Sequence, residues 1–414
     1  MSGVDSKQRL LSIIEKRQTE LVRFLRELVA IPSDNPPGDC WRIAQYVHHK
    51  FVDYQFKNVN QYDVPEQDTA TVGMKRAANV VAYEHFSESE GVEITLNSHG
   101  DVVPPGRGWT RDPYGGELIN GKLFGRGAAV SKSDIASFTF ATLALREVAE
   151  ELTGRISLAI TFDEETGGEI GPKWLLNRKL IQPDIAICPG FTHSVVNAHN
   201  GCLHMEIKIS GKQAHAAEPQ YGHDALEAMT AVLQALYLYR GKLTEKKSRV
   251  PGIDSPTLVV GTIHGGINTN VVPDECIVRF DRRLIPEEDP ELVERELETL
   301  IVNVVEKFQG AQVKLKRILL AKSFGPVPRN TPLVQAFKQN WSEVMGGELK
   351  IHGSPLYTDA RHFYEAGIPV ILFGAGPRTL LEANGHRADE HVNIDDLINA
   401  TKIVATSLYD LLKK

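Results

Sequence analysis

Three short polar segments carry side chains of the types that bind metal ions and move protons. The first contains His99 and Asp101 at the end of an apolar stretch. An imidazole can bind a metal through one ring nitrogen while a neighbouring group holds the other. Residues two apart in an extended chain point to the same side, so Asp101 can be that neighbour. Taken alone, the pair fits an ordinary turn after a strand equally well.

The second segment has three consecutive carboxylates, Asp163, Glu164 and Glu165, followed by two glycines. Charges this close repel one another, and a bound metal would offset the repulsion. We expect Glu165 to bind metal and Glu164 to act as a general base that takes a proton from water. The alternative is an exposed acidic loop that water solvates.

The third segment runs from Gly385 to Val392 and contains His386. A late histidine by itself is more often an ordinary surface or core residue than a ligand. The combination with the first two segments favours a metal site that contains His99, Glu165 and His386.

Each of these segments follows an apolar run that we expect to be a strand, the first two directly and the third on a loop after it. The runs are residues 92–98, 155–162 and 368–373, with a shorter one at 184–188. Helical periodicity predicts helices over 10–28, 41–52 and 131–147, the last with Ser131 or Ser133 as its N-cap. Strands that alternate with helices indicate an α/β domain of three layers with a mixed sheet. Ligands in such domains bind beyond the carboxyl ends of the strands, where these polar segments fall.

The middle of the chain has a different pattern. Strands and helices are expected there in the order β-α-β-β-α-β, over residues 203–209, 223–239, 257–264, 276–281 and 290–308 and a final strand. This order is typical of a ferredoxin-like α+β unit. We therefore expect a catalytic domain of residues 1–199 and 320–414, interrupted by a lid domain of residues 200–319.

Composition excludes several classes of protein. The net charge of -7, with no basic block, makes nucleic acid an unexpected partner. No run of about 18 apolar residues predicts a membrane span, and the N-terminus lacks the pattern of a secretory signal. The four scattered cysteines predict free thiols and a cytoplasmic protein.

The ordered motifs of the chain resemble the metallohydrolase family of acetylornithine deacetylase, succinyl-diaminopimelate desuccinylase and glutamate carboxypeptidase. The resemblance covers nearly the whole chain. It is carried by residues 28–33, 98–104, 121–128, 163–165, 211–215, 270–273, 358–361 and 386–390.

This resemblance implies a protomer of two domains that forms a homodimer, or a higher oligomer, through the lid. It also implies two zinc-class metals in the parent pattern. The roles carried over are metal ligand for His99, Glu165 and His386, general base for Glu164, orientation of His99 for Asp101, oxyanion stabilisation for His215 of the partner subunit, and substrate contact for Asn270 and Arg361. Arg283 either assists with substrate or forms an ion pair with Asp281.

The chain departs from the family pattern at two expected ligands. Val130 stands where the family has an aspartate that bridges both metals, and valine cannot bind a metal. Cys188 stands where the family has an acidic ligand, and it is either a thiolate ligand or a small buried thiol. With Asp134 or Cys188 as candidates to complete the shell, we expect one divalent metal of the zinc or manganese class per chain.

The predicted activity is hydrolysis of a C–N bond by metal-activated water. The expected substrate is a small carboxylate, either an N-acyl amino acid or a dipeptide-like amide. Two alternatives stay open. One is hydrolytic deamination of an amino-substituted aromatic acid, as in 5-nitroanthranilate aminohydrolase. The other is a ligand-binding scaffold without catalysis.

Overall fold

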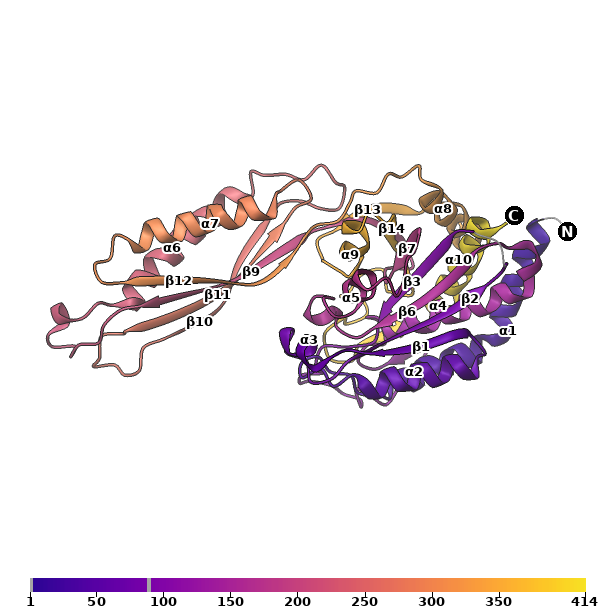
Figure 1. Ribbon diagram of the computed structural model, residues 1–414, viewed down its shortest axis with the longest axis horizontal. Coiled ribbons are helices and arrows are strands. Elements are labelled where there is room, and N and C mark those ends of the chain that lie inside the picture. Colours follow the sequence, from indigo (N-terminus) through magenta and orange to yellow (C-terminus); the bar gives the residue numbers. More distant parts are fainter. Residues whose placement is uncertain (1–2, 88–90) are drawn as a thin grey trace. The chain divides into compact units, whose positions relative to one another are not determined.

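The computed structural model describes residues 3–87 and 91–414, which form two compact units. The first unit comprises the described residues up to 197, with 327–352 and 358–414. The second comprises residues 198–326 and 353–357, a wider span than the 200–319 expected from the sequence. Figure 1 shows the helices and strands of both units.

The first unit is built on an eight-stranded mixed sheet with the strand order β1-β2-β6-β3-β7-β14-β8-β13. A smaller sheet has the order β15-β5-β4. The strands are β1 (Lys57–Asp63), β2 (Ala78–His85), β3 (Glu93–His99), β4 (Glu117–Ile119), β5 (Lys122–Phe124), β6 (Arg155–Thr161), β7 (Ile185–Cys188), β8 (Ser194–His199), β13 (Lys350–Ser354), β14 (Val370–Leu372) and β15 (His391–Asn393).

Parallel pairing in the centre of this sheet brings the polar segments to one edge. Strand β3 runs parallel to β6 and to β7, and β7 runs parallel to β14. All seven residues of β3 are buried, as expected for a parallel strand covered on both faces. The register pairs His99 with Thr161, so the residues after β3 and after β6 leave the sheet side by side.

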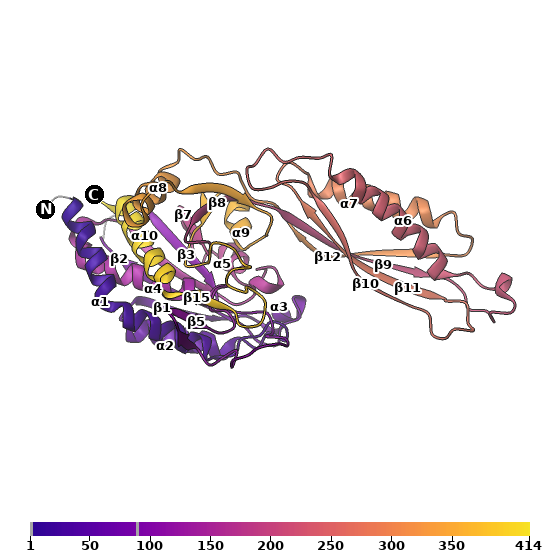
Figure 2. The same ribbon diagram turned by 180° about the vertical axis from the view of Figure 1, so that it is seen from behind.

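Helices cover both faces of the sheet (Figures 1 and 2). Helices α1, α4, α8 and α10 pack against one another on one face, with α4 next to the sheet, and α5 and α9 pack together on the other face. Every residue of α4 is buried, because this helix lies between the sheet and the outer helices. The helices are α1 (Gly3–Val29), α2 (Trp41–Asp53), α3 (Glu66–Thr71), α4 (Lys132–Leu145), α5 (Pro172–Asn177), α8 (Pro332–Met345), α9 (Ala360–Glu365) and α10 (Ile394–Leu412). The predicted three-layer α/β fold is confirmed.

One helix differs from its prediction in its end and its cap. The helix expected over 131–147 ends at Leu145 and continues as the 3₁₀ helix η1 (Arg146–Glu151). Ser131 holds the N-cap position, but its hydroxyl does not cap the helix and instead donates to the backbone oxygen of His99 over 3.3 Å. None of the helices in the described residues is long and apolar enough to cross a membrane.

The second unit is a four-stranded antiparallel sheet with the order β10-β11-β9-β12 and two helices against it. This is the ferredoxin-like arrangement predicted from the sequence. Alternate residues of β9, from Leu203 to Ile209, point toward the helices and form the core of the unit. The elements are β9 (Gly201–Ser210), η3 (Pro219–Tyr221), α6 (Ala225–Leu243), β10 (Thr257–Gly265), β11 (Glu275–Leu284), α7 (Pro290–Val305) and β12 (Gln312–Ala321).

Candidate metal centre

His99 is the last residue of β3 and is buried. Its Nδ1 lies 3.3 Å from Oδ1 of Asp101 and 3.1 Å from the backbone oxygen of Asp101. Its Nε2 lies 4.0 Å from Oε2 of Glu164. One ring nitrogen is therefore held by Asp101, and the other is directed toward the carboxylates that follow β6.

Glu164 and Glu165 lie in the 3₁₀ turn η2 (Glu164–Thr166), directly after β6 and Asp163. One ligand atom from each of His99, Glu164 and Glu165 lies within 4.8 Å of the others. We call these three residues the ligand group. An imidazole with two carboxylate oxygens is a donor set that suits a divalent transition metal, so the residues present fit the expected ion.

His386 approaches the ligand group from a loop with an unusual backbone. Its φ of 61° lies in the left-handed region, which costs a residue with a side chain more than it costs glycine. Its Nε2 lies 3.4 Å from Oε1 of Glu165, and this contact raises the pKa of His386. The strained conformation aims the imidazole at the carboxylate.

A buried ion pair fastens this loop to the segment that follows β5. Glu390 and Arg126 are buried, with Oε2 and Nη1 2.5 Å apart. The other carboxylate oxygen of Glu390 accepts hydrogen bonds from the backbone nitrogens of Ala129 and Val130, at 3.0 and 3.2 Å. The loop of His386 and the segment of Val130 are thus joined by one carboxylate.

Carboxylates outnumber cations around the ligand group. We use the name acid cluster for Asp101, Asp163, Glu164, Glu165 and Asp359. Burial raises the pKa of Asp163 to about 8 and that of Glu164 to about 7, and it raises the pKa of Asp359 well above its usual range.

The carboxylates of the acid cluster also shift the pKa of His99, the histidine of the ligand group. Burial lowers the pKa of His99, but Glu164 and Asp101 outweigh burial and raise it well above its ordinary value. Oδ2 of buried Asp359 has no hydrogen-bond partner among the described residues. A divalent cation would offset this excess of negative charge.

Arg361 lies at the start of α9 and is buried. Its guanidinium donates to the backbone oxygen of Gly167, and its Nη2 lies 3.4 Å from Oε1 of Glu169. It therefore braces the turn that carries Glu164 and Glu165, a contact that the sequence did not indicate. Its predicted contact with substrate stays a prediction.

His215 and Asn270 belong to the second unit and are exposed neighbours. Residue 215 forms an isolated bridge with Val271, and the nitrogen of Ala216 donates to the backbone oxygen of Asn270 over 3.0 Å. Nδ1 of His215 accepts from the nitrogen of Ala217 over 3.0 Å. This leaves Nε2 as the nitrogen that can meet a substrate.

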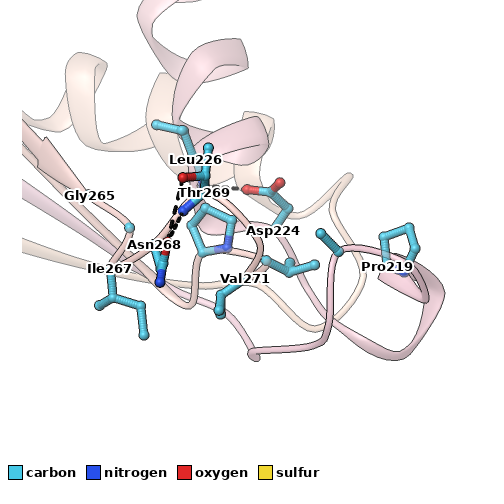
Figure 3. A pocket seen from close by; sticks show the side chains of 12 residues that line it. Pro219, Asp224, Leu226, Gly265, Ile267, Asn268, Thr269 and Val271 are labelled. Carbon is cyan, nitrogen blue, oxygen red and sulfur yellow. Dashed lines mark hydrogen bonds between the residues drawn. The ribbon is translucent and has the colours of Figure 1, made fainter.

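A cavity of about 640 Å³ opens beside these two residues in the second unit. Residues 216–226 and 265–273 contribute its lining (Figure 3). Its polar groups are tied down locally, because Asp224 caps α6 and the side chain of Asn268 accepts from the nitrogen of Thr269 over 2.8 Å. Apolar side chains such as Leu226 and Ile267 remain exposed at it.

Arg283 is engaged by an acid of its own unit. Its Nε lies 3.1 Å from both carboxylate oxygens of Asp281. Asp281 also lies 3.2 Å from Nε2 of His204. The ion pair that was one of the two alternatives for Arg283 is therefore present.

Comparison with known proteins gives the family. Residues 95–410 match the profile of peptidase family M20/M25/M40. The chain belongs to this family. Its members are metallohydrolases that act on C–N bonds, so the predicted enzyme class and the family resemblance are confirmed.

The similarity to individual known proteins extends over most of the chain. The N-formyl-4-amino-5-aminomethyl-2-methylpyrimidine deformylase of Halalkalibacterium halodurans is 26% identical and is matched over 97% of each chain. The succinyl-diaminopimelate desuccinylase of Thioalkalivibrio sulfidiphilus is 31% identical over 78% of this chain and 85% of its own. The solved dipeptidase Dug1p of Saccharomyces cerevisiae has the same fold, with a TM-score of 0.79, 14% identity and 99% coverage of both chains.

Cys188 and Asp134, the two candidates to complete the metal shell, can now be placed. Burial raises the pKa of Cys188 well above its ordinary value, and its thiol lies 3.9 Å from Oδ1 of Asn97. Oδ1 of Asp134 accepts from the nitrogen of Ala375 over 2.7 Å. Neither residue joins the ligand group in the described part of the chain. A protonated, hydrogen-bonded thiol is a poor ligand.

Two buried carboxylates near the M20/M25/M40 site were missed from the sequence. Asp359 belongs to the acid cluster, and Glu390 fastens the loop of His386. Both lie inside segments that carried the family resemblance, 358–361 and 386–390. The sequence therefore showed these two residues, but it did not show their partners, because the partners lie far away along the chain.

Proposed function

We propose that this enzyme hydrolyses the amide bond of a small carboxylate, an N-acyl amino acid or a dipeptide-like molecule. The observation that carries the proposal is the ligand group, which brings one imidazole and two carboxylates together at the ends of β3 and β6. Parallel pairing places this group where substrates of α/β domains bind.

We further propose one divalent metal per chain, of the zinc or manganese class, held by His99, Glu165 and His386. Val130 offers no donor at the expected bridging position, and Cys188 is buried beside Asn97 and is not part of the ligand group among the described residues. Three protein ligands are sufficient for one catalytic metal. The bound metal would supply a Lewis acid for the scissile carbonyl and would lower the pKa of a water molecule.

The protein side chains would divide the proton chemistry between them. Glu164 has a carboxylate beside the ligand group and a pKa of about 7 in the metal-free protein. It would take the proton from the attacking water and pass it to the departing nitrogen. Asp101 holds Nδ1 of His99 and so keeps Nε2 directed inward.

The names of the relatives favour an acyl group on nitrogen as the target. One relative is named a desuccinylase and another a deformylase, and both names describe removal of an acyl group. The carboxylate of the substrate would be recognised by Asn270 and Arg361. Arg361 is buried behind the turn that carries Glu164 and Glu165. A direct contact with the substrate would therefore require this turn to move.

We also propose that two chains form a homodimer through the second unit and that His215 of the partner subunit stabilises the oxyanion. Strand β10 lies at an edge of its sheet and exposes Val259 and Ile263, and an exposed apolar edge favours association. Mixing a His215→Ala protein with a Glu164→Gln protein tests this. Activity should appear on exchange of subunits if the histidine acts across the dimer, and no recovery would contradict it.

Metal analysis combined with a substrate screen tests the activity. We expect one metal per chain and release of a carboxylic acid from an N-acyl amino acid, an N-formyl amine or a dipeptide. Two tightly held metals would refute the single-metal proposal. Ammonia release from an amino-substituted aromatic acid would favour hydrolytic deamination over amide hydrolysis. No turnover of any substrate with metal present would favour a ligand-binding scaffold without catalysis.

A further inference from the structure

Asn35 lies in the loop after α1 and is buried, with 1% of its surface exposed. Its side-chain Nδ2 donates to Oδ2 of Asp101 over 2.9 Å and to Oγ1 of Thr166 over 3.3 Å. The first contact reaches the carboxylate that holds His99, and the second reaches the turn that carries Glu164 and Glu165. Nothing in the sequence singled out this asparagine.

The Asp101 carboxylate joins these parts of the site. It is fully buried. Oδ1 lies 3.3 Å from Nδ1 of His99 and accepts from the nitrogen of Glu164 over 3.3 Å. Oδ2 accepts from Asn35 and from the nitrogen of Glu165, the latter over 3.2 Å. Each oxygen therefore has two donors, and the amide of Asn35 has the shortest of these contacts.

The segment that carries Asn35 is itself fixed against the segment of Asp101. The hydroxyl of Ser33 donates to the backbone oxygen of Gly100 over 2.6 Å. The nitrogen of Val102 donates to the oxygen of Ser33 over 3.0 Å, and the nitrogen of Asn35 donates to the oxygen of Val102 over 2.8 Å. Hydrogen bonds on both sides of Asp101, one from the Ser33 hydroxyl and two between backbone groups, thus hold the amide at a set distance from its carboxylate.

We propose that Asn35 is a positioning residue that acts through Asp101 on the metal centre. Its amide fixes the rotation of the Asp101 carboxylate, which in turn sets the direction of the His99 ring and the position of the Glu164–Glu165 turn. A donor is required at this place, because Asp101 offers only acceptors. This inference deepens the proposed function and rests on it for its catalytic consequence, but its effect on metal binding can be measured without a substrate.

Three variants compared by Mn²⁺ titration of the metal-stripped protein test the proposal. Asn35→Ala removes the donor, and we expect the Mn²⁺ affinity to fall by roughly 10-fold, as for other groups that orient a metal ligand. Asn35→Asp places a second carboxylate against Asp101 and should weaken binding further. Asn340→Ala is the matched control, since it removes another buried asparagine whose amide donates to a carboxylate, that of Asp410 over 2.8 Å between α8 and α10, and its affinity should stay close to that of the parent.

A double variant separates pairing from general damage. Asn35→Asp with Asp101→Asn restores an amide–carboxylate pair of the same shape with the roles exchanged. We expect its melting temperature to recover relative to Asn35→Asp, while Mn²⁺ affinity stays low because His99 then faces an amide. With an active substrate in hand, Asn35→Ala should lower kcat and leave KM nearly unchanged.

Two results would overturn the assignment. One is parental Mn²⁺ affinity in both Asn35→Ala and Asn35→Asp. The other is a double variant no more stable than Asn35→Asp, which would show that the two side chains are not paired. A parent enzyme that hydrolyses none of the proposed amides would refute the proposed function alone, since the Mn²⁺ titrations and melting temperatures do not depend on it.

Discussion

Two charged clusters, one in each unit, use the same kinds of side chain with opposite results. In the acid cluster of the first unit, burial raises the pKa of Glu164 to about 7 and that of Asp163 to about 8. In the second unit, burial alone would raise the pKa of Asp281, but His204 and Arg283 hold it below its usual value. Asp281 stands between two cations, at 3.2 Å from His204 and 3.1 Å from Arg283.

The difference lies in charge balance. In the second unit, the positive charges of His204 and Arg283 balance the carboxylate of Asp281. This cluster is therefore stable in its ionised state without a ligand. The acid cluster concentrates five carboxylates around two imidazoles and leaves an oxygen of Asp359 without a partner among the described residues. Charges that are costly to the protein alone are typical of sites built for a ligand. This charge imbalance therefore favours the first unit as the place of the proposed cation.

The largest effect is expected when the acid cluster loses its proton acceptor. Glu164→Gln keeps the shape of the side chain but removes the base, and we expect kcat to fall by about 10²–10⁴-fold. Steady-state kinetics on the substrate found in the screen measures this change. Glu117→Gln, an exposed carboxylate paired with Arg111, is the control and should retain activity. Full activity of Glu164→Gln would remove Glu164 from the mechanism.

Neutralising one acid in each cluster should change stability in opposite directions. In the metal-free protein, Glu164→Gln relieves repulsion and should raise the free energy of unfolding by on the order of 1 kcal/mol. Asp281→Asn leaves His204 and Arg283 facing each other and should lower it by about 1 kcal/mol, because the group is partly exposed. Thermal unfolding at pH 8 measures both. Changes of the same sign in the two variants would contradict the difference in charge balance between the two clusters.

Saturating Mn²⁺ should make the parent protein more stable than Glu164→Gln, the reverse of the order expected without metal. A ligand that binds only the folded protein adds about 2.7 kcal/mol at 100 times its dissociation constant. Since the Glu164 carboxylate lies beside the proposed ligands His99 and Glu165 and attracts a cation held there, the parent protein should gain more from Mn²⁺ than Glu164→Gln does. Equal gains in melting temperature would show that the Glu164 carboxylate contributes nothing to binding the cation.

The smallest effect is a pH dependence of the second unit. The hydrogen bond to Asp281 raises the pKa of His204 to about 9. A histidine whose pKa is raised on folding stabilises the protein fully below about pH 6.5, and the contribution is lost as the pH rises through about 9. We expect a loss of less than about 1 kcal/mol, because the pair is partly exposed. Stability measured from pH 6 to 10 should fall less in His204→Gln than in the parent.

A second histidine of the same sheet provides the control for this measurement. His264 lies on β10 and is exposed. His264→Gln should leave the alkaline slope as it is in the parent. An identical slope in His204→Gln would place the titrating group elsewhere.

The sequence by itself determined the fold class and the family, and it predicted where the chemistry lies. The apolar runs at 92–98 and 155–162, which lead into His99 and Asp163, predicted strands of an α/β sheet. The structure pairs these strands in parallel, which brings their carboxyl ends together. Local patterns of this kind are visible in the sequence because they involve residues next to one another. The predicted roles of His215, Asn270 and Arg361 stay predictions.

Only the tertiary structure decided which side chains meet. The donor for Asp101 comes from Asn35, 66 positions earlier, and Glu390 meets Arg126 across 264 positions. It also placed Cys188 beside Asn97, where burial and the charge of Asp359 raise the pKa of its thiol, and neighbouring sequence does not reveal these surroundings. Contacts between distant segments are set by packing and register, and the ionisation of a buried group is set by all the charges around it.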